Sequence, residues 1–359
     1  MPDPARVRAA LQVAAADPQQ LSDDDAEALL AADGDDLDEL AAIADARRRE
    51  RVGDALTFVV NRNLDPARVG AGTPASRAHV RALVVEAARL GATEVCLQGP
   101  LPPGAPADGA LDLVRTVAQA VPGVHVHAFR PAEVAAAAQR AGTTPRAFLQ
   151  RAREAGLGSV PGTAAKVLDD GVRTALNGGR PDLPVARWLE LVTTAHEVGL
   201  TSTATMVYGH VETAAQQVAH LRLLARTAER TGGFTEFIPM PFTAAAGTLP
   251  QPLPAGARRG PSVRETRAVH AVARLLLDGR IDHVQAAWPK LGLELSEVVL
   301  RGGADDAGGL LLDGALDPAA GQEAGSALSR EDVEALAARL GRVPRQRTTR
   351  YGDPVPLPV

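Results

Sequence analysis

The feature that most constrains this chain is a regular alternation of short β-rich runs with amphipathic helical stretches from residue 55 onward. Such alternation is typical of parallel sheets whose strands are joined by helices, for example over 75–91 and 185–199. About eight such units without a change of pattern favour an α/β fold of the (β/α)8 TIM-barrel type over a doubly wound sheet. The predicted strands are 55–63, 93–99, 124–129, 156–162, 200–209, 234–242 and 283–292, with a weaker eighth at 308–314.

The segments on either side of the alternating region have a different character. Residues 1–53 carry helical patterns behind acidic caps, with Ser22 as the predicted cap of a helix over 21–32. The end of the chain is basic and then proline-rich, which predicts an irregular tail at the surface. We therefore expect an N-terminal helical extension (1–53), a barrel (54–314), and a C-terminal loop, helix and irregular tail packed on the barrel (315–359).

Charge and composition narrow the classes of partner. The formal net charge is −5 and the basic residues form no stripe, so we expect no nucleic-acid partner. No apolar run reaches membrane-spanning length, which argues against a membrane partner. The one cysteine, Cys96, excludes an intrachain disulfide and fits a reducing compartment, and we expect a cytoplasmic location.

Polar side chains end several of the predicted strands. In a parallel barrel these strand ends meet at one mouth, where such barrels place their sites. A proline- and glycine-rich loop over 243–262 is expected on the same face. The candidates for acid–base chemistry are Tyr208, His210, Glu236 and Lys290. The candidates for binding a ligand or cofactor are Asn61, Asn63, Gln98, Gly99, His127, Thr163 and Gln285.

Each candidate also has a purely structural interpretation. His125 and His127 share a strand face like a metal-binding pair, but no acid or third histidine has matching spacing. Buried, hydrogen-bonded histidines are therefore favoured there, and no metal site is predicted. His210 would equally serve as a helix cap. Glu236 stands between aromatic neighbours in a strand, so it needs a partner or a function. Cys96 is interpreted as a packed strand thiol.

Seven segments taken together resemble one family. They are VVNRN, ATEVCLQG, HVHAF, PGTAA, STATMVYGHVE, TGGFTEFIPMPF and PRQRTTRYG. In this order, over roughly residues 20–352, they resemble the second component of the deazaflavin (FO) synthase. That family consists of radical S-adenosylmethionine enzymes that join tyrosine to 5-amino-6-ribitylaminouracil. The resemblance implies a radical-SAM-type barrel, S-adenosylmethionine and a [4Fe–4S] cluster.

The chain departs from the family at the positions where the chemistry is expected. The family carries C-x-x-x-C-x-x-C after the VNRN-like strand end, so that three thiolates hold the cluster and one iron stays open for S-adenosylmethionine. Here the corresponding stretch, 64–74, is short and has no cysteine. Gly99-Pro100 replaces a glycine pair, and proline removes a backbone donor. Lys166 replaces a usual glutamate, Arg130 stands where serine is usual, and the segment after the sixth strand has lost its His and Glu.

These departures lead to a functional hypothesis with two alternatives. The main one is a cluster-deficient homologue, not competent for radical chemistry, that acts as a ligand-binding or partner protein. Its ligand would be tyrosine, the ribitylaminouracil or an S-adenosylmethionine-like molecule, and its protein partner an enzyme of the deazaflavin pathway. No cofactor is certain, S-adenosylmethionine is an option, and [4Fe–4S] is predicted to be absent. The alternatives are an enzyme with new, non-radical chemistry in the same pocket, and an active transferase with cluster ligands supplied otherwise.

Overall fold

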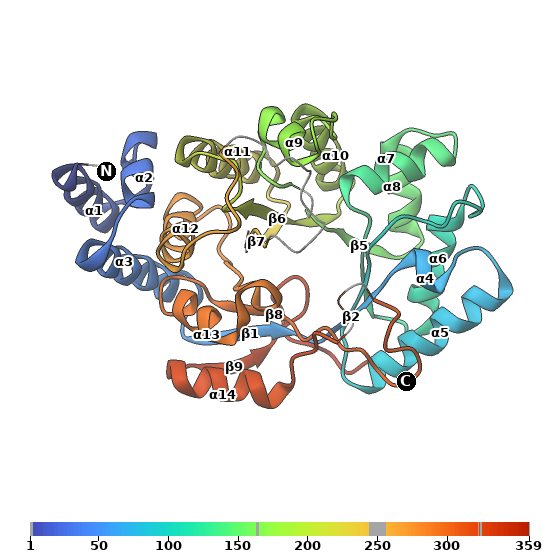
Figure 1. The fold of residues 1–359 in the computed structure, drawn as a ribbon. Coiled ribbons are helices and arrows are strands. Elements are labelled where there is room, and N and C mark those ends of the chain that lie inside the picture. Colours follow the sequence, from blue (N-terminus) through green and yellow to red (C-terminus); the bar gives the residue numbers. More distant parts are fainter. Residues whose placement is uncertain (1–2, 163–164, 244–255, 322, 324, 359) are drawn as a thin grey trace.

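The computed structural model describes residues 3–162, 165–243, 256–321, 323 and 325–358. Helices surround a curled sheet of parallel strands, as Figure 1 shows. Among the described residues, no helix is both long enough and apolar enough to cross a membrane.

The sheet closes into a barrel through a short bridging segment between β7 and β8. Six strands pair in parallel and in chain order, from β2 to β7. β1 leads into β2 across the single residue Val60 and pairs with β8, while isolated bridges at Val284 and Gln285 join β7 to β8. This circuit confirms the predicted barrel. Its strands are β1 (Ala55–Val59), β2 (Asn61–Leu64), β3 (Glu94–Leu97), β4 (His125–Ala128), β5 (Leu157–Val160), β6 (Thr201–Tyr208), β7 (Phe234–Pro241) and β8 (Asp306–Gly309).

The predicted strand over 283–292 is wrong for most of its length. Beyond the two bridged residues the chain enters a helix, α13 (Trp288–Leu300), with proline in its first turn. Proline fits that position because its missing N–H would be unpaired there in any case. The eighth strand also begins before residue 308 and ends at Gly309, short of the predicted end at 314.

The outer helices follow the predicted amphipathic stretches closely. The helices expected over 75–91 and 185–199 are confirmed as α5 and α10. Within the described residues the outer helices are α4 (Pro66–Val69), α5 (Pro74–Arg89), α6 (Gly109–Ala120), α7 (Pro131–Arg140), α8 (Pro145–Glu154), α9 (Asp170–Leu176), α10 (Val185–Glu197), α11 (Ala214–Thr231), α12 (Val263–Leu276), α13 and α14 (Arg330–Leu340).

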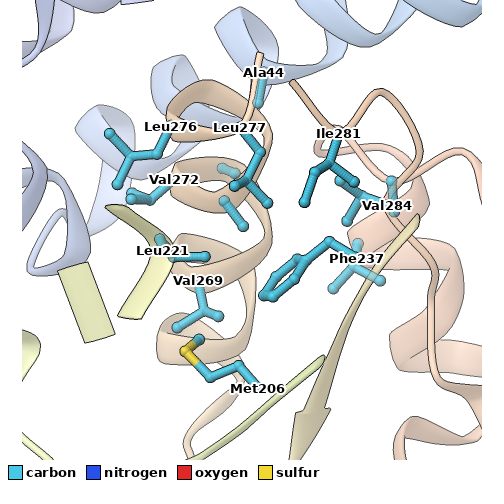
Figure 2. Packing of buried hydrophobic residues seen from close by; sticks show 14 of the residues in the cluster. Ala44, Met206, Leu221, Phe237, Val269, Val272, Leu276, Leu277, Ile281 and Val284 are labelled. Carbon is cyan, nitrogen blue, oxygen red and sulfur yellow. The ribbon is translucent and has the colours of Figure 1, made fainter. Parts of the chain in front are cut away.

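The N-terminal extension consists of α1 (Pro4–Ala16), α2 (Asp23–Leu30) and α3 (Gly34–Val52). The predicted cap is confirmed, because Ser22 Oγ accepts a hydrogen bond from the Asp25 N–H at 3.1 Å. α2 and α3 pack on α12, and α2 also contacts α11 (Figure 1). Side chains from the extension, the helices and the sheet meet in one apolar core, shown in Figure 2. Buried members of this core include Ala44 of α3, Met206 of β6, Leu221 of α11 and Phe237 of β7.

The C-terminal tail differs from the prediction of an irregular surface segment. After α14, β9 (Val343–Gln346) pairs in parallel with β1 along the edge opposite β8. Proline at position 344 is tolerated here because an edge strand has a neighbour on one side only and does not need every backbone N–H as a donor. Beyond β9 the described residues form no helix or strand, yet Arg347 and Thr349 are buried. The tail is therefore part of the barrel wall and of its interior.

Candidate functional site in the barrel interior

The polar interior of the barrel arises from strand alternation. In β3 and β4, Glu94, Cys96, His125 and His127 make polar contacts with one another or with side chains of neighbouring strands. The alternate residues of these strands, such as Val126, pack instead in the apolar cluster under the helices. A period of two residues thus divides each strand into a polar inner face and an apolar outer face.

Glu94, His125 and His127 lie together on the inner face. Glu94 is the register partner of His125 on the neighbouring strand, and ligand atoms of the three side chains all lie within 4.8 Å of one another. No acid has matching spacing along the chain, yet strand pairing places Glu94 beside the two histidines. Sequence spacing misses this acid because the pairing register, and not the distance along the chain, brings it to the pair. Ser159 Oγ of β5 lies 2.7 Å from His125 Nε2 and 2.6 Å from His127 Nδ1.

Charge and burial set the protonation of this group. Burial lowers the pKa of His125 to about 4 and that of His127 below its ordinary value, although Glu94 opposes both shifts. For Glu94, burial raises the pKa, but the nearby histidines and two hydrogen bonds outweigh it, so the pKa lies below its ordinary value. The donors to the Glu94 carboxylate are the Cys96 thiol at 3.1 Å and the Thr349 hydroxyl of the tail at 2.6 Å.

Glu236 also lies inside the barrel, bound by the tail. Arg347 donates from Nη2 to Glu236 at 2.9 Å and makes a two-point contact with Asp306 of β8, at 2.6 and 2.8 Å. The hydroxyl of Tyr351 donates to Glu236 at 2.7 Å. Burial raises the pKa of Glu236 to about 6, the Arg347 cation opposes this shift, and Asp306 adds to it. Glu236 therefore has structural partners, and these are Arg347 and Tyr351 of the tail.

The other three acid–base candidates lie elsewhere. Tyr208 is buried under α12, edge-on to His270 with ring centroids 6.2 Å apart, and burial raises the pKa of its hydroxyl well above the ordinary value. His210 forms part of the turn after β6, where its Nε2 lies 2.8 Å from the Val207 carbonyl oxygen. Lys290 is exposed in the first turn of α13, not at a strand end. The structure therefore does not bring Tyr208, His210, Glu236 and Lys290 into one site.

Some of the ligand-binding candidates already make hydrogen bonds within the chain. Asn61 Oδ1 accepts from the Leu311 N–H at 3.0 Å, and Asn63 Nδ2 donates to Glu323 at 2.9 Å. Gln98 is half-buried at the end of β3. The Gln285 amide reaches Gly308, where an added Cβ would lie 2.0 Å from its Nε2. Thr163 lies outside the described residues, as does most of the loop 243–262.

The stretch that replaces the expected cysteine loop is well ordered by local hydrogen bonds. Asp65 caps α4 by accepting from the Ala67 N–H at 2.9 Å, and Thr73 forms a capping box with Ser76 at the start of α5. The Asp65 N–H also donates to the Ala320 carbonyl at 2.7 Å, which closes this stretch against the loop after β8. The chain's one thiol, Cys96, lies in β3, where burial raises its pKa well above the ordinary value. Three thiolates for a cluster are therefore not available from the residues of this chain.

A cavity of about 440 Å³ opens beside Gly99 at the ends of β3 and β4. Its wall is mostly apolar, formed by Leu101, Phe129 and alanines of α6 and α7. Arg130 and Arg140 add guanidinium groups, and Glu133 binds Arg130 Nε at 2.8 Å. The size and the apolar lining with few polar groups are typical of small-molecule sites.

Sequence reasoning missed the tail as a contributor to the interior. Arg347, Thr349 and Tyr351 bind Glu94, Glu236 and Asp306, although they lie in a basic segment that resembles a solvated surface. The sequence does contain one signal that this part of the tail is not ordinary surface. The run RQRTTRYG carries part of the family resemblance, whereas the residues after it are rich in proline.

Comparison with known proteins agrees with the resemblance. Residues 231–357 match the family model for the CofH/MqnC C-terminal region. The FO synthase of Mycobacterium leprae is 46% identical over 361 residues, which covers 96% of this chain and 41% of that protein. The chain thus spans less than half of the length of this relative. The 5-amino-6-(D-ribitylamino)uracil–L-tyrosine 4-hydroxyphenyl transferase of Archaeoglobus fulgidus is 37% identical over 321 residues, covering 86% of this chain and 92% of that protein.

Solved structures support the fold. The maturase HydG of the [FeFe]-hydrogenase superposes with a TM-score of 0.67 at 14% identity, covering 96% of this chain and 76% of that chain. Methylornithine synthase (PylB) superposes with a TM-score of 0.65 at 16% identity, covering 93% and 97%. The near-complete match to the archaeal transferase, together with the match to the family model, shows that this chain belongs to the FO synthase second-component family.

Proposed function

We propose that this chain is a cluster-deficient member of its family, which binds a small ligand or a partner enzyme of deazaflavin biosynthesis without performing radical S-adenosylmethionine chemistry. The family assignment supports the pathway, since similar chains are FO synthases and a 4-hydroxyphenyl transferase. The lack of thiolates supports the loss of the radical step.

One observation carries this proposal: the sequence has a single cysteine, and its sulfur is buried in β3 between Glu94 and Asn61. A cluster that activates S-adenosylmethionine needs three thiolates and one open iron position. The stretch from Asp65 to Thr73 is also capped at both ends and held against Ala320 by hydrogen bonds, which supports a structure that is stable without a metal centre.

The cavity beside Gly99 is the proposed ligand site. Its apolar wall around Phe129 would accept an aromatic ring, and the guanidinium of Arg140 would face a carboxylate or phosphate-like group. Tyrosine combines both features, and the ribitylaminouracil is the second candidate. S-adenosylmethionine is the third, because the resembling family has a glycine pair that receives its methionine end where this chain has Gly99-Pro100.

Anaerobic iron–sulfur reconstitution tests the missing cluster. We expect iron and acid-labile sulfide at background level, equal in the wild type and in Cys96→Ser, since the buried thiol contributes to no cluster. A family member with the three-cysteine motif serves as the positive control. Near-stoichiometric [4Fe–4S] in the wild type would overturn the proposal and favour an active transferase with ligands supplied otherwise.

A thermal-shift screen with tyrosine, the ribitylaminouracil and S-adenosylmethionine tests the ligand site. A ligand at 100 times its Kd stabilises the folded state by about 2.7 kcal/mol. Ala136→Phe fills the cavity from α7 and should abolish the shift, whereas Gln139→Phe, on the same helix outside the lining, should keep it. A shift that survives Ala136→Phe would place the ligand elsewhere.

Repurposed acid–base chemistry is less well supported. It would need several of the four candidate groups at one point, but Glu236 is bound by the tail and Tyr208 lies under α12. If Glu236→Ala and His210→Ala leave all ligand binding unchanged, this alternative fails.

A further inference from the structure

We propose that Glu94, His125 and His127 form a binding site for a divalent transition-metal ion of the zinc class. The three residues come from the paired strands β3 and β4, and their ligand atoms lie within 4.8 Å of one another. This site is separate from the ligand cavity beside Gly99 and does not depend on the function proposed above.

The ligand set suits such an ion. Two imidazoles and one carboxylate hold zinc in several hydrolytic enzymes and leave a position open, and the same set holds iron(II) in oxygenases. Magnesium and calcium prefer sites made of oxygen atoms alone. A borderline ion with nitrogen affinity is therefore the expected occupant.

The backbone around the pair is built to accommodate the rings. Gly158 of β5 lies directly under His125, where an added Cβ would come within 2.4 Å of Cε1. The next residue, Ser159, places its hydroxyl between the two rings. This hydroxyl has one proton, so it donates to one nitrogen at most and accepts from the other. With a metal ion bound, Ser159 would act as an outer partner that orients the rings, as metal-bound histidines require.

Burial of the carboxylate is the second argument. Glu94 is only 6% exposed, and the donors that it has, the Cys96 thiol and the Thr349 hydroxyl, are neutral. A buried carboxylate is costly unless a cation compensates for it. The guanidinium of Arg347 is bound to Glu236 and Asp306 instead. A divalent ion next to Glu94 would add a full positive charge to the neutral hydrogen bonds that already hold this carboxylate.

A route to the site exists from the side of the tail. A cavity of about 500 Å³ is lined by His125, Thr93, Thr348 and Arg350, together with residues near the C-terminus such as Leu357. Arg350 and Asp353 both line this cavity, so one cation and one carboxylate flank the path of an ion towards His125.

The direct test is zinc binding by the wild-type protein after chelator treatment. Elemental analysis and a chelator competition should give one Zn²⁺ per chain, and Co²⁺ substitution should give the visible absorption of a four-coordinate site. His127→Ala and Glu94→Gln should each weaken zinc binding by at least about 100-fold, more than an outer-shell change costs. The controls are His79→Asn and His196→Asn, which remove histidines paired with Asp317 and Ser202 and should leave the affinity unchanged.

The proposal can be refuted with the wild-type protein alone, so the test does not depend on whether each variant folds. If the folded wild type binds no zinc or cobalt above the level of a nonspecific control, the site does not exist. Gly158→Ala provides a second variant that keeps all three ligands and displaces only the His125 ring. Unchanged affinity in folded Gly158→Ala and His127→Ala would also overturn the proposal. Iron bound here would carry no acid-labile sulfide, so this result is distinct from the reconstitution test for a cluster.

Discussion

Two buried carboxylates in this molecule behave in opposite ways. Glu236 lies in β7 inside the barrel, and burial together with neighbouring Asp306 raises its pKa to about 6 despite Arg347. Glu212 lies in the turn after β6; burial raises its pKa as well, but its hydrogen bonds outweigh this effect and lower it to about 2. Both side chains are nearly inaccessible to solvent. Burial alone therefore does not determine the charge state.

The difference comes from the number of hydrogen-bond donors and from the nearness of a second acid to Glu236. Glu212 accepts hydrogen bonds from the N–H groups of Gly209 and His210, from the amide of Gln217 and from Arg258. Glu236 accepts from Arg347 and Tyr351, and Arg347 is shared with the second carboxylate of Asp306. Nδ1 of the His210 ring also lies 2.8 Å from Glu212, and Arg258 is itself shared with Glu265. The His210 ring and the donors of the turn thus stabilise the ionised form of Glu212, whereas Asp306 works against the ionised form of Glu236.

The largest expected effect comes from removing the shared cation. Arg347→Ala leaves Glu236 and Asp306 buried without their guanidinium, and breaking a buried pair in this way costs about 3–5 kcal/mol. We expect a matching loss in the free energy of urea unfolding. The control is Arg345→Ala, an exposed arginine two residues earlier, which should change stability by at most about 0.5 kcal/mol. Equal effects of the two variants would contradict a role of the tail inside the barrel.

Glu212→Gln should be the next largest change. The folded-state pKa of Glu212 is about 2 against an ordinary 4.5, so its ionised form stabilises the protein above pH 4.5 by about 3 kcal/mol. This contribution is lost as the pH falls through 4.5 towards 2. We therefore expect the variant to be less stable at neutral pH and to approach the wild type near pH 2. Unfolding curves at several pH values would show the convergence, and parallel pH profiles would disprove it.

Glu236→Gln should show the opposite pH dependence. Because the folded-state pKa is raised from 4.5 to about 6, the protonated form of Glu236 favours folding at low pH. That contribution, about 2 kcal/mol, is lost as the pH rises through 4.5 to 6. The variant should lack this decline, so its stability relative to the wild type should improve over the same range. A decline of equal size in the variant would assign the effect to another group.

Gln217→Ala offers the smallest and sharpest test of the donor argument. It removes one neutral donor, whose amide lies 2.8 Å from Glu212 Oε1, and leaves the backbone donors in place. Removing one hydrogen bond to a charged group should cost about 1.5 kcal/mol at neutral pH. The loss should fall as Glu212 becomes protonated, which acid titration of the unfolding midpoint would detect. Gln216→Ala, at the exposed capping box of α11, is the matched glutamine control.

Much of the fold could be predicted from local pattern. The alternation of β-rich and helical runs gives β3 to β7 and the main outer helices nearly at their observed positions, and Ser22 identifies the start of α2. These features depend on the period of apolar residues and on capping chemistry within a few residues, which a single chain displays directly. The resemblance of seven separate segments was likewise sufficient to identify the family, as its relatives confirm.

The site could be predicted only in part. The sequence predicts Glu236, His127 and Tyr208 at strand ends around one mouth. In the structure Glu236 and His127 make polar contacts inside the barrel, whereas Tyr208 at the end of β6 packs under α12. One residue of alternation separates the inner face of a strand from its outer face, so strand membership alone does not decide orientation. Lys290 was misplaced because a proline-started helix replaces the end of the predicted seventh strand.

The sequence by itself determined the barrel, the family and the supply of a single thiol, because each can be read from local periodicity, motif order or a simple count. Only the tertiary structure decided what fills the interior. Strand register brings Glu94 to the two histidines. The pairing of β9 with β1 brings Arg347 and Tyr351 into contact with Glu236, from which they are separated by more than 100 residues of sequence. Such contacts depend on which strands become neighbours, and that information is carried by the packing of the whole chain and by no segment alone.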